Sequence, residues 1–222
     1  AYPLRRAPAT SRDTVPRSRL LASSGVDEAS GTIDPMGLFA MGSFTDIRAA
    51  WQTLMPPGSI DLQNDESYRV EAKRLVRELV HGNTVPKGDV VTPLKTLAES
   101  GFQLAVLTND SEDSARRSLD ELGIASLFHP IIGADSGHGG KPEPHGLLHC
   151  LSVHGTDPSR ALMIGDTGAD FGAATNARVA DFICIADDPL YRPHQDVKVD
   201  NVISRLVDLP DLLARQGYMP RS

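Results

Sequence analysis

The sequence predicts an α/β protein: a Rossmann-like three-layer core with a parallel sheet, preceded by a small helical cap. From residue 90 onward, short apolar runs alternate with helical segments, which is typical of parallel strands joined by crossover helices. Between residues 46 and 80 the apolar positions follow helical spacing alone, which predicts helices without strands.

Length, charge and composition limit the classes to which the chain can belong. Its 222 residues suffice for one sizeable core and a small second domain. The formal net charge of −7 offers no basic field for nucleic acid, and no apolar run reaches the roughly 20 residues of a membrane helix. The two cysteines, Cys150 and Cys184, form no CxxC pair. We therefore expect a reducing, cytoplasmic setting, with neither nucleic acid nor membrane as a partner.

The first 20 residues form a compositionally separate segment. It contains five arginines and only one acidic residue, Asp13, and most of its other residues are Pro, Ser, Ala and Thr. This composition predicts a disordered arm over residues 1–20. It also fits a remnant of an organelle transit peptide, which would make the protein organellar, whereas the lack of an apolar run in the segment argues against a secretory signal.

Two domains are expected after this arm. Residues 21–88 should form a partial helical cap, with helices around 47–54 and 68–79 separated by Pro56-Pro57-Gly58. Residues 89–222 should form the α/β core. Its predicted order is helix 90–99, strand 102–107, helix 112–122, strand 130–133, helix 145–153, strand 161–164, helix 168–176, strand 182–185, and a short strand or turn before a closing helix in 202–213.

Two loops of this core carry residues that can bind an anion. Ligands of such sheets bind at the carboxyl ends of the strands. Thr108, Asn109 and Asp110 follow the strand at 102–107, where a hydroxyl and backbone amides can hold an anion, although these residue types are also ordinary helix caps. In the loop at 139–144, two prolines hold Lys141 in an extended chain, where its ammonium can neutralise a phosphoryl group or hold a carboxylate. The alternative for a single lysine is a solvated surface position.

A third loop carries two carboxylates. Asp166 follows the strand at 161–164, and Asp170 is expected on the same side, in the first turn of the next helix. Two carboxylates with few other ligands suit Mg²⁺, which keeps several of its waters. The alternative is helix capping by Asp166, with Asp170 stabilised by the helix dipole; it explains one aspartate better than the pair.

In this order, strand–Thr-Asn, Lys-Pro and strand–Gly-Asp-x-x-x-Asp resemble the second, third and fourth motifs of the haloacid dehalogenase superfamily. The resemblance covers about residues 86–186, and the stretch 134–144 is similar to phosphoglycolate phosphatase-type members. It implies hydrolysis of a small phosphorylated metabolite through an aspartyl-phosphate, with Mg²⁺ as cofactor. By that resemblance Thr108 and the backbone at Asn109 would hold the phosphoryl group. Lys141 would neutralise it together with the nucleophile, Asp166 would bind Mg²⁺, and Asp170 would act through water or hold Lys141.

The family's first motif, Asp-x-Asp-Gly-Thr after an apolar strand, supplies the nucleophile, and no segment matches it closely. Anchored on residues 31–32, the nucleophile position holds Glu28 and the acid/base position holds Ser30, while Asp27 reaches the spot only with an extra loop residue. The same stretch is also similar to the start of the cap in phosphoglycolate phosphatase-type members. In that case the first strand and its motif are absent from the sequence.

In that family the first strand lies between the strands that end at Thr108 and Gly165, so its absence would leave two inner edges unpaired. We expect one of three arrangements: a segment within residues 15–26 fills the gap, a strand from a partner fills it, or the sheet closes. Two functions stay open, a Mg²⁺-dependent phosphatase and a catalytically inactive phosphate-binding or scaffold protein. A dehalogenase, which needs no metal, is disfavoured by Asp166 and Asp170.

Overall fold

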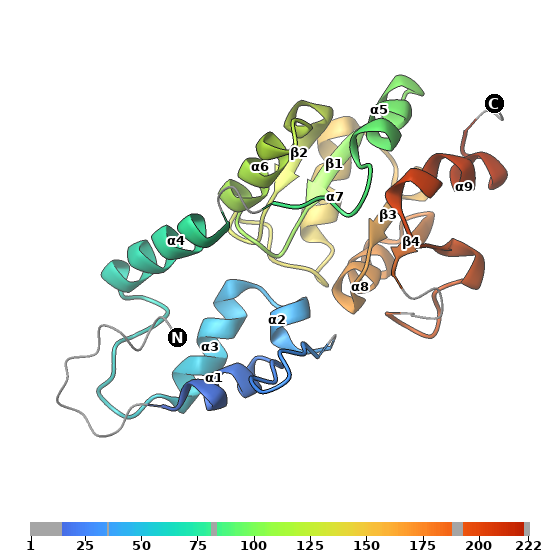
Figure 1. The fold of residues 1–222 in the computed structure, drawn as a ribbon. Coiled ribbons are helices and arrows are strands. Elements are labelled where there is room, and N and C mark those ends of the chain that lie inside the picture. Colours follow the sequence, from blue (N-terminus) through green and yellow to red (C-terminus); the bar gives the residue numbers. More distant parts are fainter. Residues whose placement is uncertain (1–14, 35, 81–83, 188–192, 220–222) are drawn as a thin grey trace. The chain divides into compact units, whose positions relative to one another are not determined.

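A computed structural model describes residues 15–34, 36–80, 84–187 and 193–219 (Figure 1). The chain divides into two compact units, Ala1–Asn83 and Thr84–Ser222. Helix α1 (Arg17–Ser23) begins inside the segment predicted to be a disordered arm, and its Leu20 is buried. The prediction of disorder is therefore wrong for residues 15–20, where Val15 and Leu20 are both buried. Residues 1–14 lie outside the described part of the chain.

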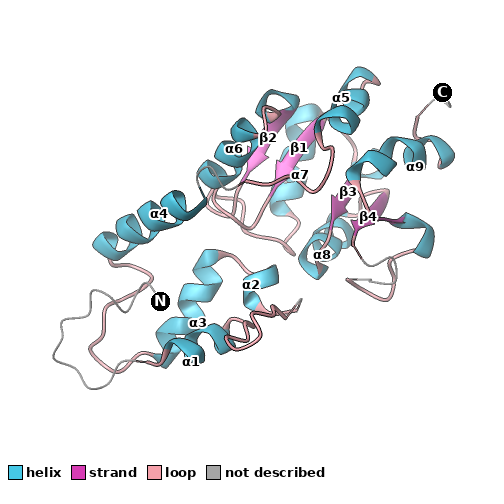
Figure 2. Cartoon of the chain, in the orientation of Figure 1, coloured by secondary structure: helices cyan, strands magenta, loops and turns pink. Residues whose placement is uncertain are grey.

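The described part of the first unit is built from helices (Figure 2). After α1 come α2 (Leu38–Met41), α3 (Phe44–Leu54) and α4 (Glu66–Val80), and the last two are the helices that the apolar spacing predicts. The indole N–H of Trp51 on α3 ties this helix to α1, since it lies 2.9 Å from the carbonyl oxygen of Leu20 and 2.8 Å from the hydroxyl of Ser24. The unit thus has an apolar core of its own, which includes Ile47 and Leu62.

The second unit alternates helices and strands, as the sequence predicts. The elements run α5 (Val91–Glu99), β1 (Leu104–Leu107), α6 (Glu112–Glu121), β2 (Phe128–Ile132), α7 (His145–His154), β3 (Leu162–Gly165), α8 (Gly168–Ala177), β4 (Asp181–Ile185), β5 (Val202–Ile203) and α9 (Leu209–Arg215). Every strand pair is parallel: β1 with β2, β3 with β4, and β4 with β5.

Helices cover both faces of these strands, which makes three layers. One apolar cluster joins Leu97 of α5 and Leu212 of α9 to Ile183 of β4, with Leu104 of β1 and Ile164 of β3 packed against it. The other cluster lies with α7 and α8; its members include Leu147, Ala174, Met163 and Cys184, and Leu107 of β1 packs against them. Since strands of both ladders contribute to both clusters, they form one layer. The α/β, Rossmann-like prediction is confirmed.

Within the described residues this layer is interrupted between β1 and β3. The strands form one ladder of order β1-β2 and another of order β3-β4-β5. Two of the three expected arrangements are therefore wrong: residues 17–23 are helical rather than a filling strand, and the sheet does not close. A strand from a partner stays a prediction.

Burial differs from strand to strand. The apolar run at 102–107 predicted a buried strand, yet no residue of β1 is buried, and in β3 only Met163 is. In β4, which is paired on both sides, the three residues Phe182, Ile183 and Cys184 are buried. β2 also pairs on one side only, yet Pro130, Ile131 and Ile132 are buried, so an unpaired edge does not by itself set the burial of a strand. No helix among the described residues is long and apolar enough to cross a membrane.

Candidate functional site

The three loops predicted to carry chemistry are joined by direct contacts. The side chain of Asn109, two residues after β1, bonds to the backbone of Lys141. The ammonium of Lys141 lies 2.6 Å from Oδ1 of Asp170, in the first turn of α8. Asp166 lies in the loop between β3 and α8. The structure thus brings these loops together at the carboxyl ends of β1 and β3, the end of a parallel sheet at which ligands bind.

Thr108 is held by the backbone of its own loop. Its N–H donates to the carbonyl of Ile132 on β2 at 2.9 Å, and its hydroxyl oxygen accepts from the N–H of Asp110 at 3.1 Å. Helix α6 is capped by Ser111, whose hydroxyl accepts from the N–H of Ser114. The capping interpretation of residues 108–110 is therefore wrong. The hydroxyl of Thr108 still has its hydrogen to donate to a ligand.

Asn109 clamps the lysine loop through both ends of its amide. Its Oδ1 accepts from the N–H of Lys141 at 2.7 Å, and its Nδ2 donates to the carbonyl of the same residue at 2.9 Å. From the other side, Asn176 of α8 donates to the carbonyl of Pro142 at 3.0 Å. Only 12% of the Lys141 side chain is exposed, so the interpretation as a solvated surface lysine is wrong.

Asp170 has both carboxylate oxygens occupied. Oδ1 faces Lys141, while Oδ2 accepts from the N–H of Thr167 at 3.0 Å, its hydroxyl at 2.7 Å and the N–H of Asp166 at 3.2 Å. Thr167 is the helix cap and Asp170 completes its capping box, so the prediction that Asp166 caps the helix is wrong. A Cβ at Gly165 would lie 2.4 Å from Cγ of Asp170, so glycine is needed there for the carboxylate to fit.

Asp166 is the exposed member of the aspartate pair. Surrounding protein nevertheless removes enough water to raise the pKa of its carboxyl, and the negative charge of Asp170 acts in the same direction. The cations Lys141 and Lys87 oppose this rise. The pair predicted to bind metal is therefore divided by its environment: Asp170 is buried and faces a lysine, and Asp166 is open to a ligand.

These residues fit Mg²⁺ better than a metal that is caged by protein. In the described part of the chain, no three His, Cys, Asp or Glu side chains come together as a metal site. Mg²⁺ is commonly held by one or two carboxylates, with waters and substrate phosphate oxygens as its other ligands. Asp166 can supply such a carboxylate.

The stretch considered as a degenerate first motif is a turn. Asp27 accepts from the N–H groups of Ala29 at 2.9 Å and Ser30 at 2.8 Å, and its own N–H donates to the carbonyl of Thr32. Glu28 pairs with Arg17 at 3.2 Å. The only bridge next to this turn in the described chain is antiparallel, between residues 26 and 33. The interpretation thus lacks the parallel strand that this motif requires.

The sequence reasoning missed two charged residues at this end of the sheet. Asp187 lies two residues beyond β4, and its Oδ2 is 3.1 Å from the ammonium of Lys87. Asp187 follows a strand just as Asp166 does, so the same rule of strand ends would have found it. Lys87 had no such signal, because it lies in a turn before α5 and meets Asp187 across 100 residues of sequence.

The comparisons with known proteins give one consistent result. The profile of the haloacid dehalogenase-like hydrolases matches residues 58–184, more than half of the chain. A phosphoglycolate phosphatase of Nitrosococcus oceani is 34% identical over 125 residues, which are 55% of this chain and 54% of that protein. One of Aquifex aeolicus is 36% identical over 94 residues, 42% of this chain and 44% of that protein. The chain therefore spans about half the length of these relatives.

Solved structures agree on the fold. A haloacid dehalogenase-like hydrolase of Bacteroides fragilis superposes with a TM-score of 0.65 at 23% identity, over 86% of this chain and 88% of the other. A 2-haloacid dehalogenase of Pseudomonas syringae pv. Tomato superposes with a TM-score of 0.58 at 25% identity, over 91% of this chain and 83% of the other.

Proposed function

The chain belongs to the haloacid dehalogenase-like hydrolases and is similar to phosphoglycolate phosphatases, and from this premise we propose that it takes part in Mg²⁺-dependent hydrolysis of small phosphorylated metabolites. The observation that carries the proposal is the continuous connection from Asn109 through Lys141 to Asp170. It holds a hydroxyl, an ammonium and an open carboxylate at the carboxyl ends of β1 and β3. That set of groups suits a phosphoryl dianion.

Each residue then has a separate role. The hydroxyl of Thr108 donates to the phosphoryl oxygens, helped by the backbone at Asn109, whose side chain fixes the lysine loop. Lys141 keeps two of its three N–H donors for the phosphoryl group, because one faces Asp170. Asp166 holds Mg²⁺. The metal is needed to balance charge. Asp166, Asp170 and Lys141 together leave the site with a net negative charge before the anionic phosphate binds, and Mg²⁺ would supply two positive charges.

The chemistry proposed is that of an aspartyl-phosphate. A carboxylate attacks phosphorus, the bond to the leaving oxygen breaks, and that oxygen takes a proton; water then hydrolyses the acyl phosphate. Among the described residues, no aspartate ends a strand between β1 and β3. A strand contributed by a partner is the one arrangement left open above. It would bring the attacking carboxylate to the position between β1 and β3.

The test combines turnover with chemical trapping. We expect hydrolysis of p-nitrophenyl phosphate that needs Mg²⁺, disappears in Asp166→Ala and is unchanged in Asp120→Ala, which removes an exposed aspartate on α6. Borohydride reduction of the acid-quenched acyl phosphate, followed by mass spectrometry, identifies the nucleophile and the chain that carries it. Phosphate binding without turnover would contradict the phosphatase proposal, and a reduced Asp27 or Glu28 would contradict a nucleophile on a partner strand.

A further inference from the structure

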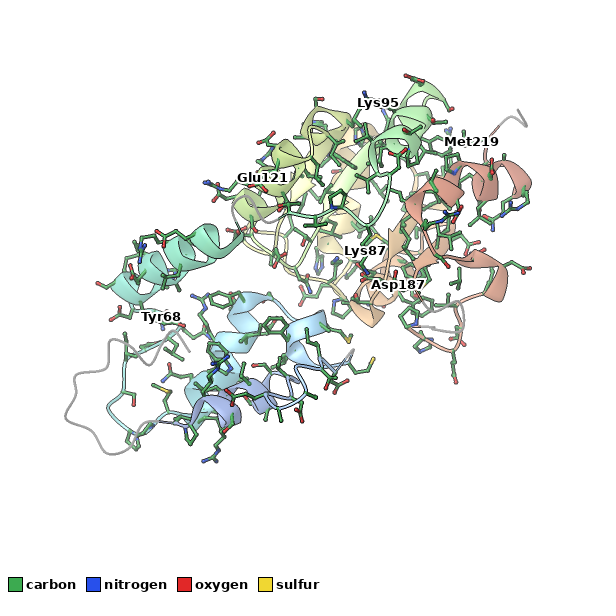
Figure 3. All side chains as sticks on the ribbon, in the orientation of Figure 1. Tyr68, Lys87, Lys95, Glu121, Asp187 and Met219 are labelled. Carbon is green, nitrogen blue, oxygen red and sulfur yellow. The ribbon has the colours of Figure 1, made fainter. Side chains whose placement is uncertain are left out.

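A short turn after β2, residues 133–136, is bonded to the start of α6. Glu112 is the first residue of this helix, at the end opposite Glu121, which Figure 3 labels. The N–H of Glu112 donates to Oδ1 of Asp135 at 2.8 Å. The hydroxyl of Ser136 donates to Oε2 of Glu112 at 2.7 Å. The turn and the helix are therefore joined through both the backbone and the side chain of Glu112.

The hydroxyl of Ser136 uses both its hydrogen and its oxygen within the protein. Besides donating to Glu112, it accepts from the N–H of Gly133 at 3.0 Å, and the N–H of Ser136 donates back to the carbonyl of Gly133 at 3.1 Å. Hydrogen bonds from Ser136 and then from Arg116 lower the pKa of Glu112, so this side chain is a carboxylate that can only accept. Replacing Ser136 by alanine would thus remove two bonds that define the turn.

The turn holds the backbone that orients Thr108. The N–H of Ala134 donates to the carbonyl of Asp110 at 2.9 Å, and the N–H of Asp110 donates to the hydroxyl oxygen of Thr108 at 3.1 Å. A Cβ at Gly133 would overlap the N–H of Glu112 and lie 2.8 Å from the carbonyl oxygen of Asp110, so this close approach requires glycine. Because a hydroxyl group can rotate, the bond from Asp110 decides where the hydrogen of Thr108 points.

We propose that Ser136 is a positioning residue of the phosphoryl site. Its bond to Glu112 fixes the turn, and the turn fixes the backbone of Asp110. The N–H of Asp110 then directs the hydroxyl of Thr108 towards the phosphoryl group. This assignment rests on the proposed function, and it adds a residue that touches neither the phosphoryl group nor the metal.

The experiment is a double-variant cycle on the full chain, in which calorimetry measures the affinity for inorganic phosphate with Mg²⁺ present. In Ser136→Ala we expect phosphate to bind about fivefold more weakly, because the hydroxyl of Thr108 must then be ordered on binding. Thr108→Val should weaken binding about tenfold. The double variant should also lose about tenfold rather than about fiftyfold, because Ser136 acts only through that hydroxyl. A role in folding alone would not produce this coupling.

A second variant removes the acceptor instead of the donor. Glu112→Ala leaves the serine in place and should show the same fivefold loss and the same coupling to Thr108, so it decides the question if Ser136→Ala does not fold. Arg116→Gln removes the other partner of Glu112 and should leave phosphate affinity unchanged. Ser152→Ala, which removes an exposed hydroxyl bonded within α7, should also leave it unchanged.

The outcomes separate this role from the phosphoryl site on which it rests. Unchanged affinity in Ser136→Ala and Glu112→Ala overturns the role of Ser136 and leaves the phosphoryl site standing. A double variant whose loss is the product of the two single losses does the same, because the effect of Ser136 would then not pass through Thr108. If the unaltered chain binds no phosphate, the phosphoryl site and the role of Ser136 are both overturned.

Discussion

The buried pair between Lys141 and Asp170 gives the sharpest test of how the site is assembled. Its ammonium and carboxylate lie 2.6 Å apart, with only 12% and 5% of the side chains exposed. At an effective dielectric constant of about 20, two unit charges at that separation attract by about 6 kcal/mol, and desolvation of both groups offsets much of this. The perturbations are Asp170→Asn, Lys141→Met and the double variant.

Each single variant leaves one buried charged group without its partner: the ammonium in Asp170→Asn and the carboxylate in Lys141→Met. Removing one partner of a buried pair typically costs about 3–5 kcal/mol, and we expect about 3 kcal/mol for each single variant here. The ammonium left by Asp170→Asn can turn partly to water. The carboxylate left by Lys141→Met keeps its three donors from Asp166 and Thr167. In the double variant no charge is stranded, so its loss should equal that of a single variant rather than their sum.

Urea unfolding measures these losses. With a slope of about 2 kcal/mol per molar, a loss of 3 kcal/mol lowers the midpoint by about 1.5 M. Circular dichroism follows the transition, and the difference in its midpoint between each variant and the unaltered chain gives the loss. Strictly additive single losses would refute the coupling. They would mean that Asp170 acts through its capping box alone.

Three further outcomes test other contacts. Asn109→Ala removes both bonds to the backbone of Lys141. It should weaken the binding of inorganic phosphate with Mg²⁺ by about tenfold, since two hydrogen bonds contribute roughly 1.5 kcal/mol net. Unchanged phosphate affinity by calorimetry would show that the bonds from Asn109 are not needed for binding. Thr108→Val should weaken phosphate binding about tenfold while Thr108→Ser preserves it, and equal effects of both variants would exclude the hydroxyl as a ligand donor. Burial tends to raise the pKa of Asp181, but hydrogen bonds from Lys198 and Asn201 outweigh it and lower the pKa. The urea-midpoint difference from Asp181→Asn should therefore be full above the ordinary pKa of about 3.9 and vanish as pH falls through the lowered value; a difference that persists in acid contradicts this linkage.

The order of elements and the position of the three loops could be predicted because both depend on local signals. Short apolar runs and helical spacing identify β1, β3 and β4 within a few residues, and the rule of strand ends then points to Thr108 and Asp166. Their partners could not be read in this way. Lys141 meets Asp170 across 29 residues, and only the family resemblance, not a local pattern, had indicated that Asp170 could hold the lysine.

Burial and termini were the weaker part of the prediction for a related reason. The burial of β1 depends on which distant segments cover it, and these are not a property of Leu104 or Val106. In the same way, the arginine-rich composition of the first residues masked two buried apolar side chains, Val15 and Leu20, which flank or belong to α1. Average composition does not show which few side chains of a segment are buried.

The use of polar atoms separates the residues that position the site from those that meet a ligand. The amide oxygen and nitrogen of Asn109 both bond to the backbone of Lys141. One carboxylate oxygen of Asp170 faces Lys141, and the other accepts from Thr167. Thr108 keeps a hydroxyl hydrogen, and Lys141 keeps two donors. Because every amide and carboxylate heavy atom of the first two residues is bonded within the described chain, substituting them should change where the ligand groups lie. Substituting the last two should change which groups the ligand meets. These loops can therefore bind phosphate even when no nucleophile is present. A variant that loses only turnover should still bind phosphate.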